Sequence, residues 1–246
     1  MSTTKLIAIG AAAVLFSATA AIAAPEGAPD WAYGDGELPE NWSITNEAYA
    51  TCDAGLMQSP IDLGNANASG EVDFAASYGE ARGTVKTGPG KIQVDLDPGM
   101  GLISGDTLFS LLQFHFHTPA EHVMDGKLHP LVVHFVHGSR TGQFAVLGVM
   151  FEEGEANPAL DAIIAGVDSD NPVSVDVSQM IPEDYDIYRY MGSLTTPPCT
   201  EGVNWHIADE TVEASAQQIA AMRTRLGKSN RSLQPINNRL IVAPGD

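Results

Sequence analysis

Residues 108–117 read LFSLLQFHFH, and this segment decides how the surrounding chain folds. Apolar and polar side chains alternate along its second half, which is the two-residue period of a β-strand. Gln113, His115 and His117 therefore share one face of the predicted strand, whereas Phe114 and Phe116 lie on the other. We expect the two phenylalanines to be buried and the polar side chains to face a different environment.

Similar short segments lie on both sides of this strand in the chain. Glycines and prolines separate predicted strands at residues 91–96, 131–137, 143–151 and 186–192. Two segments favour helices, residues 157–165 with Asn157 as the cap, and residues 212–226, which Gly227 ends. The pattern predicts a mostly β (α+β) fold, a single domain around a large, mainly antiparallel central sheet with small peripheral helices.

The composition fits one folded domain with an acidic surface. Of 246 residues, 44% are hydrophobic, which is enough for a sizeable core, and no linker divides the chain. Acidic residues number 31 against 12 basic ones, so the formal net charge is -19. Such a surface repels nucleic acid and anionic lipid, and we expect neither as a partner.

The first residues predict a targeting segment. Lys5 precedes an apolar, alanine-rich run from Leu6 to Ala23, and the last three residues of this run fit a small-x-small cleavage pattern. We expect residues 1–23 to be a signal peptide and residues 24–246 to be the folded domain, exported to a periplasm or out of the cell. The alternative is an uncleaved membrane anchor, because the run is about long enough to span a bilayer.

The chain has two cysteines, Cys52 and Cys199. In an exported protein such a pair usually forms a disulfide, which would close a very long loop. Two buried free thiols are the alternative that the residues alone leave open.

Histidines supply the strongest chemical signal. His134 lies in the predicted strand 131–137, so its ring meets those of His115 and His117 if the two strands are neighbours. Three neutral nitrogens with one open position are the arrangement of a catalytic zinc site. Copper and nickel accept the same ligands, and the spacing does not decide the metal. The simpler alternative is three half-buried histidines of a sheet that bind no metal.

Several motifs, in this order, resemble those of the α-carbonic anhydrases. The central ones are residues 113–117, Glu121-His122, residues 134–137 and the segment Gly192 to Pro198. Others lie at residues 31–34 and 58–62 on one side, and at 204–205, 234–235 and 238–239 on the other. The resemblance covers nearly all of residues 24–246. It implies an enzyme that reversibly hydrates carbon dioxide to bicarbonate and a proton by attack of zinc-bound hydroxide.

The resemblance also implies roles for individual residues. His115, His117 and His134 correspond to the ligands of Zn²⁺. Thr195 corresponds to the hydroxyl that accepts a hydrogen bond from the zinc-bound hydroxide, and Glu121 to the carboxylate that orients this hydroxyl.

Further positions correspond to the surroundings of the zinc. The carbon dioxide pocket would be formed by Val136, Val146, Leu194, Thr196 and Trp205. Gln113 resembles the hydrogen-bond partner of the first zinc histidine, and Tyr33 the tyrosine of the solvent network. Cys52 and Cys199 match two positions that are bridged in secreted and bacterial members, which favours the disulfide.

Two positions depart from the family pattern. Gly90 stands where many members have a histidine that carries protons to solvent, so we expect proton export to be slow or buffer-dependent. Val132 stands where the family usually has a glutamate that accepts the second N–H of the third zinc histidine. We expect weaker zinc retention, unless water, a backbone carbonyl or His122 replaces that acceptor.

The sequence is also compatible with two other functions. One is a catalytically weak, carbonic anhydrase-like binding module, although all three zinc histidines are present. The other is a zinc esterase, as a side activity of the same site. We expect carbon dioxide and bicarbonate as the small-molecule partners, no membrane contact after cleavage, and a monomer or homodimer. The remaining histidines, His122, His129, His137 and His206, are expected to be structural or exposed.

Overall fold

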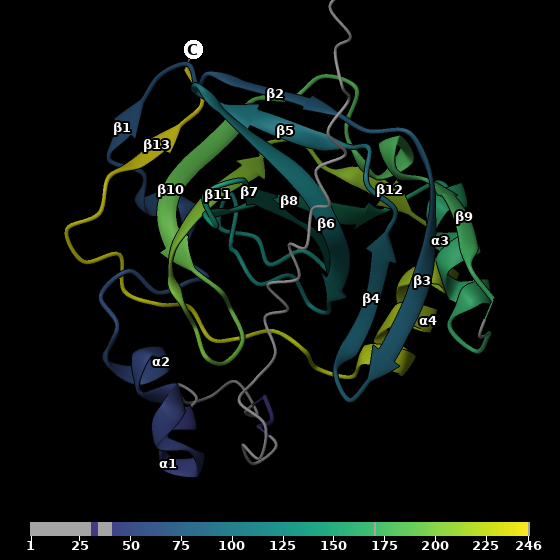
Figure 1. The fold of residues 1–246 in the computed structure, drawn as a ribbon, viewed down its shortest axis with the longest axis horizontal. Coiled ribbons are helices and arrows are strands. Elements are labelled where there is room, and N and C mark those ends of the chain that lie inside the picture. The colour runs from purple at the N-terminus through teal and green to yellow at the C-terminus, as the bar shows by residue number, and fades with distance from the viewer. Residues whose placement is uncertain (1–30, 34–40, 170, 246) are drawn as a thin grey trace, which may run out of the picture.

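The computed structural model describes residues 31–33, 41–169 and 171–245 (Figure 1). One sheet of 13 strands forms the centre of the fold, and short helices lie around it. The predicted fold class, mostly β with a large sheet and small peripheral helices, is confirmed. The predicted signal peptide, residues 1–23, lies outside the described residues.

Ten strands form the main path of the sheet, in the order β1-β13-β10-β11-β8-β7-β6-β4-β3-β9. The strands are β1 (Ala68–Ser69), β2 (Phe74–Ser77), β3 (Glu80–Gly88), β4 (Lys91–Leu96), β5 (Gly101–Ser104), β6 (Thr107–His117), β7 (Leu131–Ser139), β8 (Phe144–Glu153), β9 (Val173–Asp176), β10 (Ile187–Ser193), β11 (Glu201–Ala208), β12 (Val212–Ala214) and β13 (Ile241–Ala243). Most neighbouring strands are antiparallel, but β11 and β12 run parallel to β8, and β1 runs parallel to β13.

The helical segments are short. They are α1 (Trp42–Thr45), α2 (Ala50–Ala54), α3 (Pro158–Gly166) and α4 (Ala216–Leu226), with 3-10 turns η1 (Glu47–Tyr49), η2 (Leu63–Asn65) and η3 (Val177–Met180). In Figure 1, α1 and α2 lie apart from the sheet at one end, whereas α3 lies beside β9. None of the helices in the described part of the chain has the length and apolar character that crossing a membrane requires.

The predicted helix at residues 212–226 is wrong at its start. Val212–Ala214 form β12, in which Val212 pairs with Phe151 of β8. The helix begins only after Ser215, whose hydroxyl accepts a hydrogen bond from the N–H of Gln218. This cap marks the start of a helix and β-branched Val212 suits a strand, so the periodic pattern ran past a boundary that the serine indicates. Gly227 ends the helix as predicted.

The other predicted elements agree closely with the structure. The strands β4, β6, β7, β8 and β10 lie where the alternating segments place them, within about two residues at each end. Helix α3 follows Asn157, whose side chain accepts hydrogen bonds from the N–H groups of Ala159 and Leu160. The local sequence patterns therefore predict most of the elements that build the sheet.

The sheet has two differently packed faces. On the first, here called the far face, Phe114, Phe116 and Phe135 pack in the larger apolar cluster, to which α3 contributes Leu160 and α4 contributes Met222. Burying each such side chain contributes about 1.5–3 kcal/mol, so this cluster stabilises the strands on which the histidines lie. The second, here called the site face, carries a smaller cluster around Val132, Val136, Val146 and Trp205.

The predicted disulfide between Cys52 and Cys199 is present, with the Cα atoms 5.0 Å apart. It joins α2 to the segment after β10 that contains Thr195. The sulfur atoms lie in a small buried cluster with Trp42 and Tyr49. The covalent link therefore attaches the polar segment of the site face to the N-terminal helices.

Candidate metal centre and active site

Three histidine side chains converge on the site face. Strands β6 and β7 are antiparallel neighbours, and His115 lies directly opposite His134. His117 follows His115 by two residues and so projects from the same face. The ring centroids are 4.8 to 5.4 Å apart, and one candidate ligand nitrogen from each ring lies within 4.8 Å of the others. The structure thus brings all three predicted ligands together.

Hydrogen bonds determine which nitrogens face the centre. His115 Nδ1 is 3.0 Å from Gln113 Oε1, and His117 Nδ1 is 2.6 Å from the backbone oxygen of Ser229. Because these oxygens only accept, each Nδ1 carries the proton and each Nε2 keeps a free lone pair. His117 Nε2 is buried and has no hydrogen-bond partner. Both rings therefore present Nε2 as the candidate ligand atom.

His134 presents the opposite ring nitrogen. Its Nδ1 is 3.7 Å from Glu121 Oε2, and His117 Nε2 is 3.5 Å from the same oxygen, so the two nitrogens face one point. His134 Nε2 lies on the other edge of the ring, toward Gly148 of β8. The candidate ligand of His134 is therefore Nδ1.

The surroundings disfavour the charged form of His115 and of His134. Burial, followed by the neighbouring His117, lowers the pKa of His115 and of His134 well below its ordinary value. A neutral imidazole is the form that binds metal. Three converging imidazole nitrogens, one of them a buried atom without a partner, fit a zinc ion that keeps a fourth position open.

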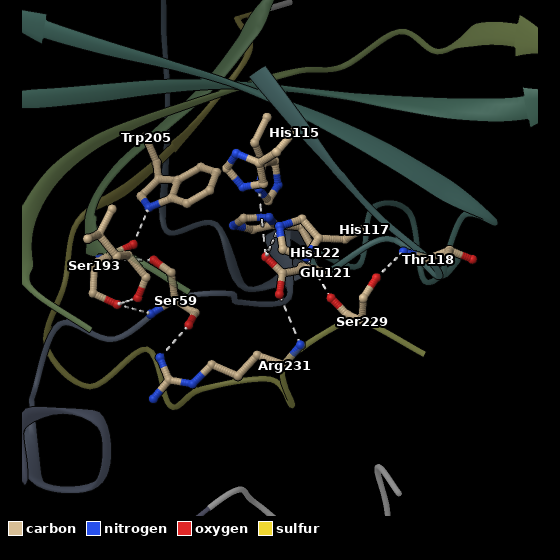
Figure 2. A network of polar contacts seen from close by, with 12 residues as sticks. Ser59, His115, His117, Thr118, Glu121, His122, Ser193, Trp205, Ser229 and Arg231 are labelled. Atoms are coloured by element: carbon tan, nitrogen blue, oxygen red, sulfur yellow. Dashed lines mark hydrogen bonds and ion pairs between the residues drawn. The ribbon is translucent and has the colours of Figure 1, made fainter. Parts of the chain in front are cut away.

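A buried carboxylate lies beside the histidines. Glu121 is 1% exposed, and its Oε1 accepts a hydrogen bond from the backbone N–H of Arg231 at 2.9 Å. Figure 2 shows the carboxylate between the histidine rings and Arg231. Burial raises the pKa of Glu121, while His117, Arg231 and the Thr195 hydroxyl act in the opposite direction. The carboxylate can therefore orient the hydroxyl of Thr195.

Thr195 belongs to a tightly held segment that follows β10. Leu194 N–H donates to Thr200 O at 3.0 Å, and Cys199 N–H donates to Thr196 O at 2.9 Å. At the end of β10, Trp205 Nε1 donates to Ser193 O at 2.8 Å. These contacts and the disulfide fix the buried Thr195 relative to the sheet.

A cavity of about 290 Å³ leads to the histidines. The predicted residues Val136, Leu194 and Thr196 line it, as do Gln113 and Tyr33. The predicted residues Val146 and Trp205 are fully buried in the apolar cluster of the site face, beneath this lining. The cavity lining therefore combines apolar side chains with polar groups.

Two residues that the sequence did not indicate hold the site. Ser229 accepts from His117 through its backbone oxygen, and Arg231 donates to Glu121 through its backbone nitrogen. The Arg231 guanidinium also donates to the backbone oxygen atoms of Cys52 and Ser59. Because the contacts to His117 and Glu121 use backbone atoms, no side-chain pattern could have revealed them.

The four other histidines are all buried. His122 Nε2 is 2.6 Å from the hydroxyl of Tyr190, and burial lowers the pKa of His122 to about 3. His129 lies 3.4 Å from the carboxylate of Glu152. His137 and His206 lie on the far face, each beside a hydroxyl group.

Val132 offers no hydrogen-bond acceptor near the third candidate zinc histidine. Val132 lies opposite His117 and, two residues before His134, projects from the same face. Neither His134 Nε2 nor His122 Nδ1 has a hydrogen-bond partner among the described residues. Neither a backbone carbonyl nor His122 therefore replaces the acceptor that valine lacks.

Gly90 lies in the cavity wall, at the turn between β3 and β4. Gly88 pairs with Lys91, so Pro89 and Gly90 alone form the turn, and Gly90 has a φ of +65°. A Cβ at this position would come within 3.1 Å of the Tyr33 ring. The turn therefore favours glycine, which carries no titratable group.

Comparisons with known proteins agree with this geometry. A family model described as eukaryotic-type carbonic anhydrase matches residues 37–244. A carbonic anhydrase of Pectobacterium carotovorum is 36% identical over 219 residues, which cover 86% of this chain and 90% of that protein. One from a Nostoc strain is 34% identical over 97% of this chain and 95% of that protein. The solved α-carbonic anhydrase of Photobacterium profundum superimposes with a TM-score of 0.79 at 34% identity, covering 87% and 100% of the two chains.

Proposed function

The chain belongs to the eukaryotic-type, or α, carbonic anhydrases and catalyses the reversible hydration of carbon dioxide, and we propose that it does so with a Zn²⁺ ion held by His115, His117 and His134. The strongest support for the site is the convergence of three imidazoles at a cavity that apolar side chains partly line. Zinc supplies a nucleophile at neutral pH by lowering the pKa of a bound water, as established for carbonic anhydrases.

In this proposal Glu121 and Thr195 select the group that occupies the fourth position. An ionised carboxylate only accepts hydrogen bonds, so the Thr195 hydroxyl donates a hydrogen bond to Glu121. The Thr195 oxygen can then act only as a hydrogen-bond acceptor for a group bound to the metal. It therefore favours a group there that still carries a proton, and it orients the lone pair of that group toward the cavity.

The apolar side chains of the cavity lining suit the substrate. Carbon dioxide is small, uncharged and apolar, so it needs no charged anchor, and Val136 and Leu194 offer it a hydrophobic surface next to the histidines. Val146 and Trp205 support this surface from below. Gln113 keeps His115 in the tautomer that leaves Nε2 free, and Tyr33 lies 3.4 Å from His117 Nδ1 at the solvent side.

Substitution of Thr195 tests the site. We expect Thr195→Ala to keep one zinc ion per chain and to lower the rate of carbon dioxide hydration by roughly 10–100-fold, because it removes the oriented hydroxyl. Stopped-flow kinetics on metal-quantified protein measure this rate. The matched control is Thr224→Ala, which changes an exposed threonine of helix α4. Full activity in Thr195→Ala, or an inert wild-type protein with stoichiometric zinc, would contradict the proposal. The latter result would favour the binding-module alternative.

We further propose that proton export depends on the buffer, because Gly90 offers no titratable group on the cavity wall. We expect the turnover number for hydration to rise with buffer concentration at constant pH and ionic strength, since buffer molecules carry the proton. A small buffer such as imidazole should act more strongly than a bulky one. A turnover number that stays constant across buffer concentrations would contradict this proposal.

Export and side activity complete the proposal. The alanine-rich leader at residues 1–23 and the disulfide between Cys52 and Cys199 support a mature protein in a periplasm or outside the cell. Ester hydrolysis would use the same nucleophile and would be lost together with hydration in Thr195→Ala.

A further inference from the structure

One charged side chain at the cavity has no role in the function described above. Lys91 is the first residue of β4, it is exposed, and it lines the cavity next to Gly90. Gln93, two residues further, lies directly opposite His115 of β6. Because alternate residues of a strand share a face, Lys91 projects from the same face as the metal-binding histidines.

Lys91 is also the only residue with a full positive charge among the described residues that line the cavity. Asp95 lies on the same face of β4 and feels the charge of Lys91, but it forms its ion pair with Lys86 and accepts a hydrogen bond from Gln93. No carboxylate in the described part of the chain lies within ion-pair distance of Lys91. Lys91 therefore lines the cavity without an ion-pair partner among the described residues.

The chain as a whole carries a formal charge of -19, which repels small anions as they approach. Bicarbonate, the product of hydration and the substrate of the reverse reaction, is such an anion.

We propose that Lys91 is an anion-recruiting residue that raises the affinity of the cavity for bicarbonate and for other small monovalent anions. The inference rests on the proposed metal site at the bottom of the same cavity. Lys91 acts through its charge and without contact with the reacting atoms, so it is a positioning residue. Its ammonium group is a compact positive charge, so it attracts anions.

Anion binding to the cobalt-substituted protein tests this inference. Co²⁺ at a zinc site has a visible absorption spectrum that changes when a ligand binds, so dissociation constants are obtained without an activity assay. The probes are bicarbonate, thiocyanate and the neutral ligand imidazole. The proteins are wild type, Lys91→Gln, Lys91→Arg and Lys91→Glu. Lys127→Gln is the matched control, since it removes the same charge from a lysine that pairs with Glu152 and does not line the cavity.

At low ionic strength, we expect Lys91→Gln to weaken the binding of both anions by roughly three- to tenfold, and Lys91→Glu to weaken it further. Imidazole affinity should not change, Lys91→Arg and Lys127→Gln should resemble wild type, and added salt should reduce the differences. Unchanged anion affinity in Lys91→Gln, or an equal loss of imidazole affinity, would overturn the inference. A wild-type protein without a cobalt spectrum would instead contradict the metal site, and with it this inference.

Discussion

Strand β7 carries buried histidines on both of its faces, and they serve different purposes. His134 belongs to the site face, and His137, three residues later, belongs to the far face. On the far face, His137 Nε2 lies 3.0 Å from the Tyr78 hydroxyl, and His206 Nε2 lies 2.9 Å from the Ser104 hydroxyl. On the site face, one ring nitrogen from each of three histidines lies within 4.8 Å of the other two. Convergence of nitrogens, and not burial, therefore distinguishes the metal site.

The largest expected effect is a loss of zinc and activity on substitution of His134 but not of His137. We expect His134→Ala to lose stoichiometric zinc and to reduce hydration to the background rate, because only two of the three protein ligands of a catalytic zinc site remain. The matched variant His137→Gln should keep zinc and activity, since it changes a ring of the same strand that faces away from the cavity. Metal analysis and stopped-flow kinetics measure both. Equal zinc loss in the two variants would show that the distinction between the faces is wrong.

A second, smaller effect concerns the partner that His134 lacks. We expect Val132→Glu to slow zinc release to a strong chelator by roughly 10–100-fold, because the carboxylate can accept from His134 Nε2, which now has no partner. His122 Nδ1, also without a partner, is a further donor for it. Val132→Leu is the control, since leucine is buried in the same way but accepts no hydrogen bond. Equal release rates in these two variants would contradict the expectation.

The smallest effect belongs to the far face and concerns acid stability. Burial lowers the pKa of His206 and of His137 to about 3, against about 6.5 for an unfolded chain. Between these pH values the unfolded chain binds more protons than the folded chain. The free energy of unfolding is therefore unaffected by these two histidines above about pH 6.5, and it decreases as the pH falls below that value. Each histidine lowers the free energy of unfolding by about 1.4 kcal/mol per pH unit in this window.

Urea unfolding of the metal-free protein measures this effect. We expect His206→Gln to lose about 2 kcal/mol less stability than wild type between about pH 6.5 and about pH 5. His137→Gln should behave in the same way if its ring is equally well buried. Parallel pH profiles for all three proteins would contradict the assignment of these rings as buried neutral groups.

Much of the site could be predicted from sequence because side chains of one strand obey a simple period. The spacing of His115 and His117, with apolar residues between them, placed both rings on one face, and the family resemblance supplied Thr195 and Glu121. The disulfide followed from the same resemblance. These features depend on residue types at fixed spacings, which a sequence displays directly.

What could not be predicted depends on backbone atoms and on pairing between distant segments. Ser229 and Arg231 contact the site through backbone groups, so their side chains carry no signal. The parallel pairing of β11 with β8 joins segments about sixty residues apart, and local alternation does not contain this information. The start of α4 was missed because the apolar period of a short strand merges with that of the following helix.

The turn at Pro89 and Gly90 has a consequence for anyone who wishes to make this enzyme faster. Exchanging Gly90 for histidine would force a side chain into a left-handed backbone conformation, at a cost of about 1–2 kcal/mol, and would press its Cβ against Tyr33. A proton-carrying side chain at this position would therefore strain the turn and displace the Tyr33 ring. A longer hairpin between β3 and β4 would allow a proton-carrying side chain at the cavity without a residue in the left-handed conformation.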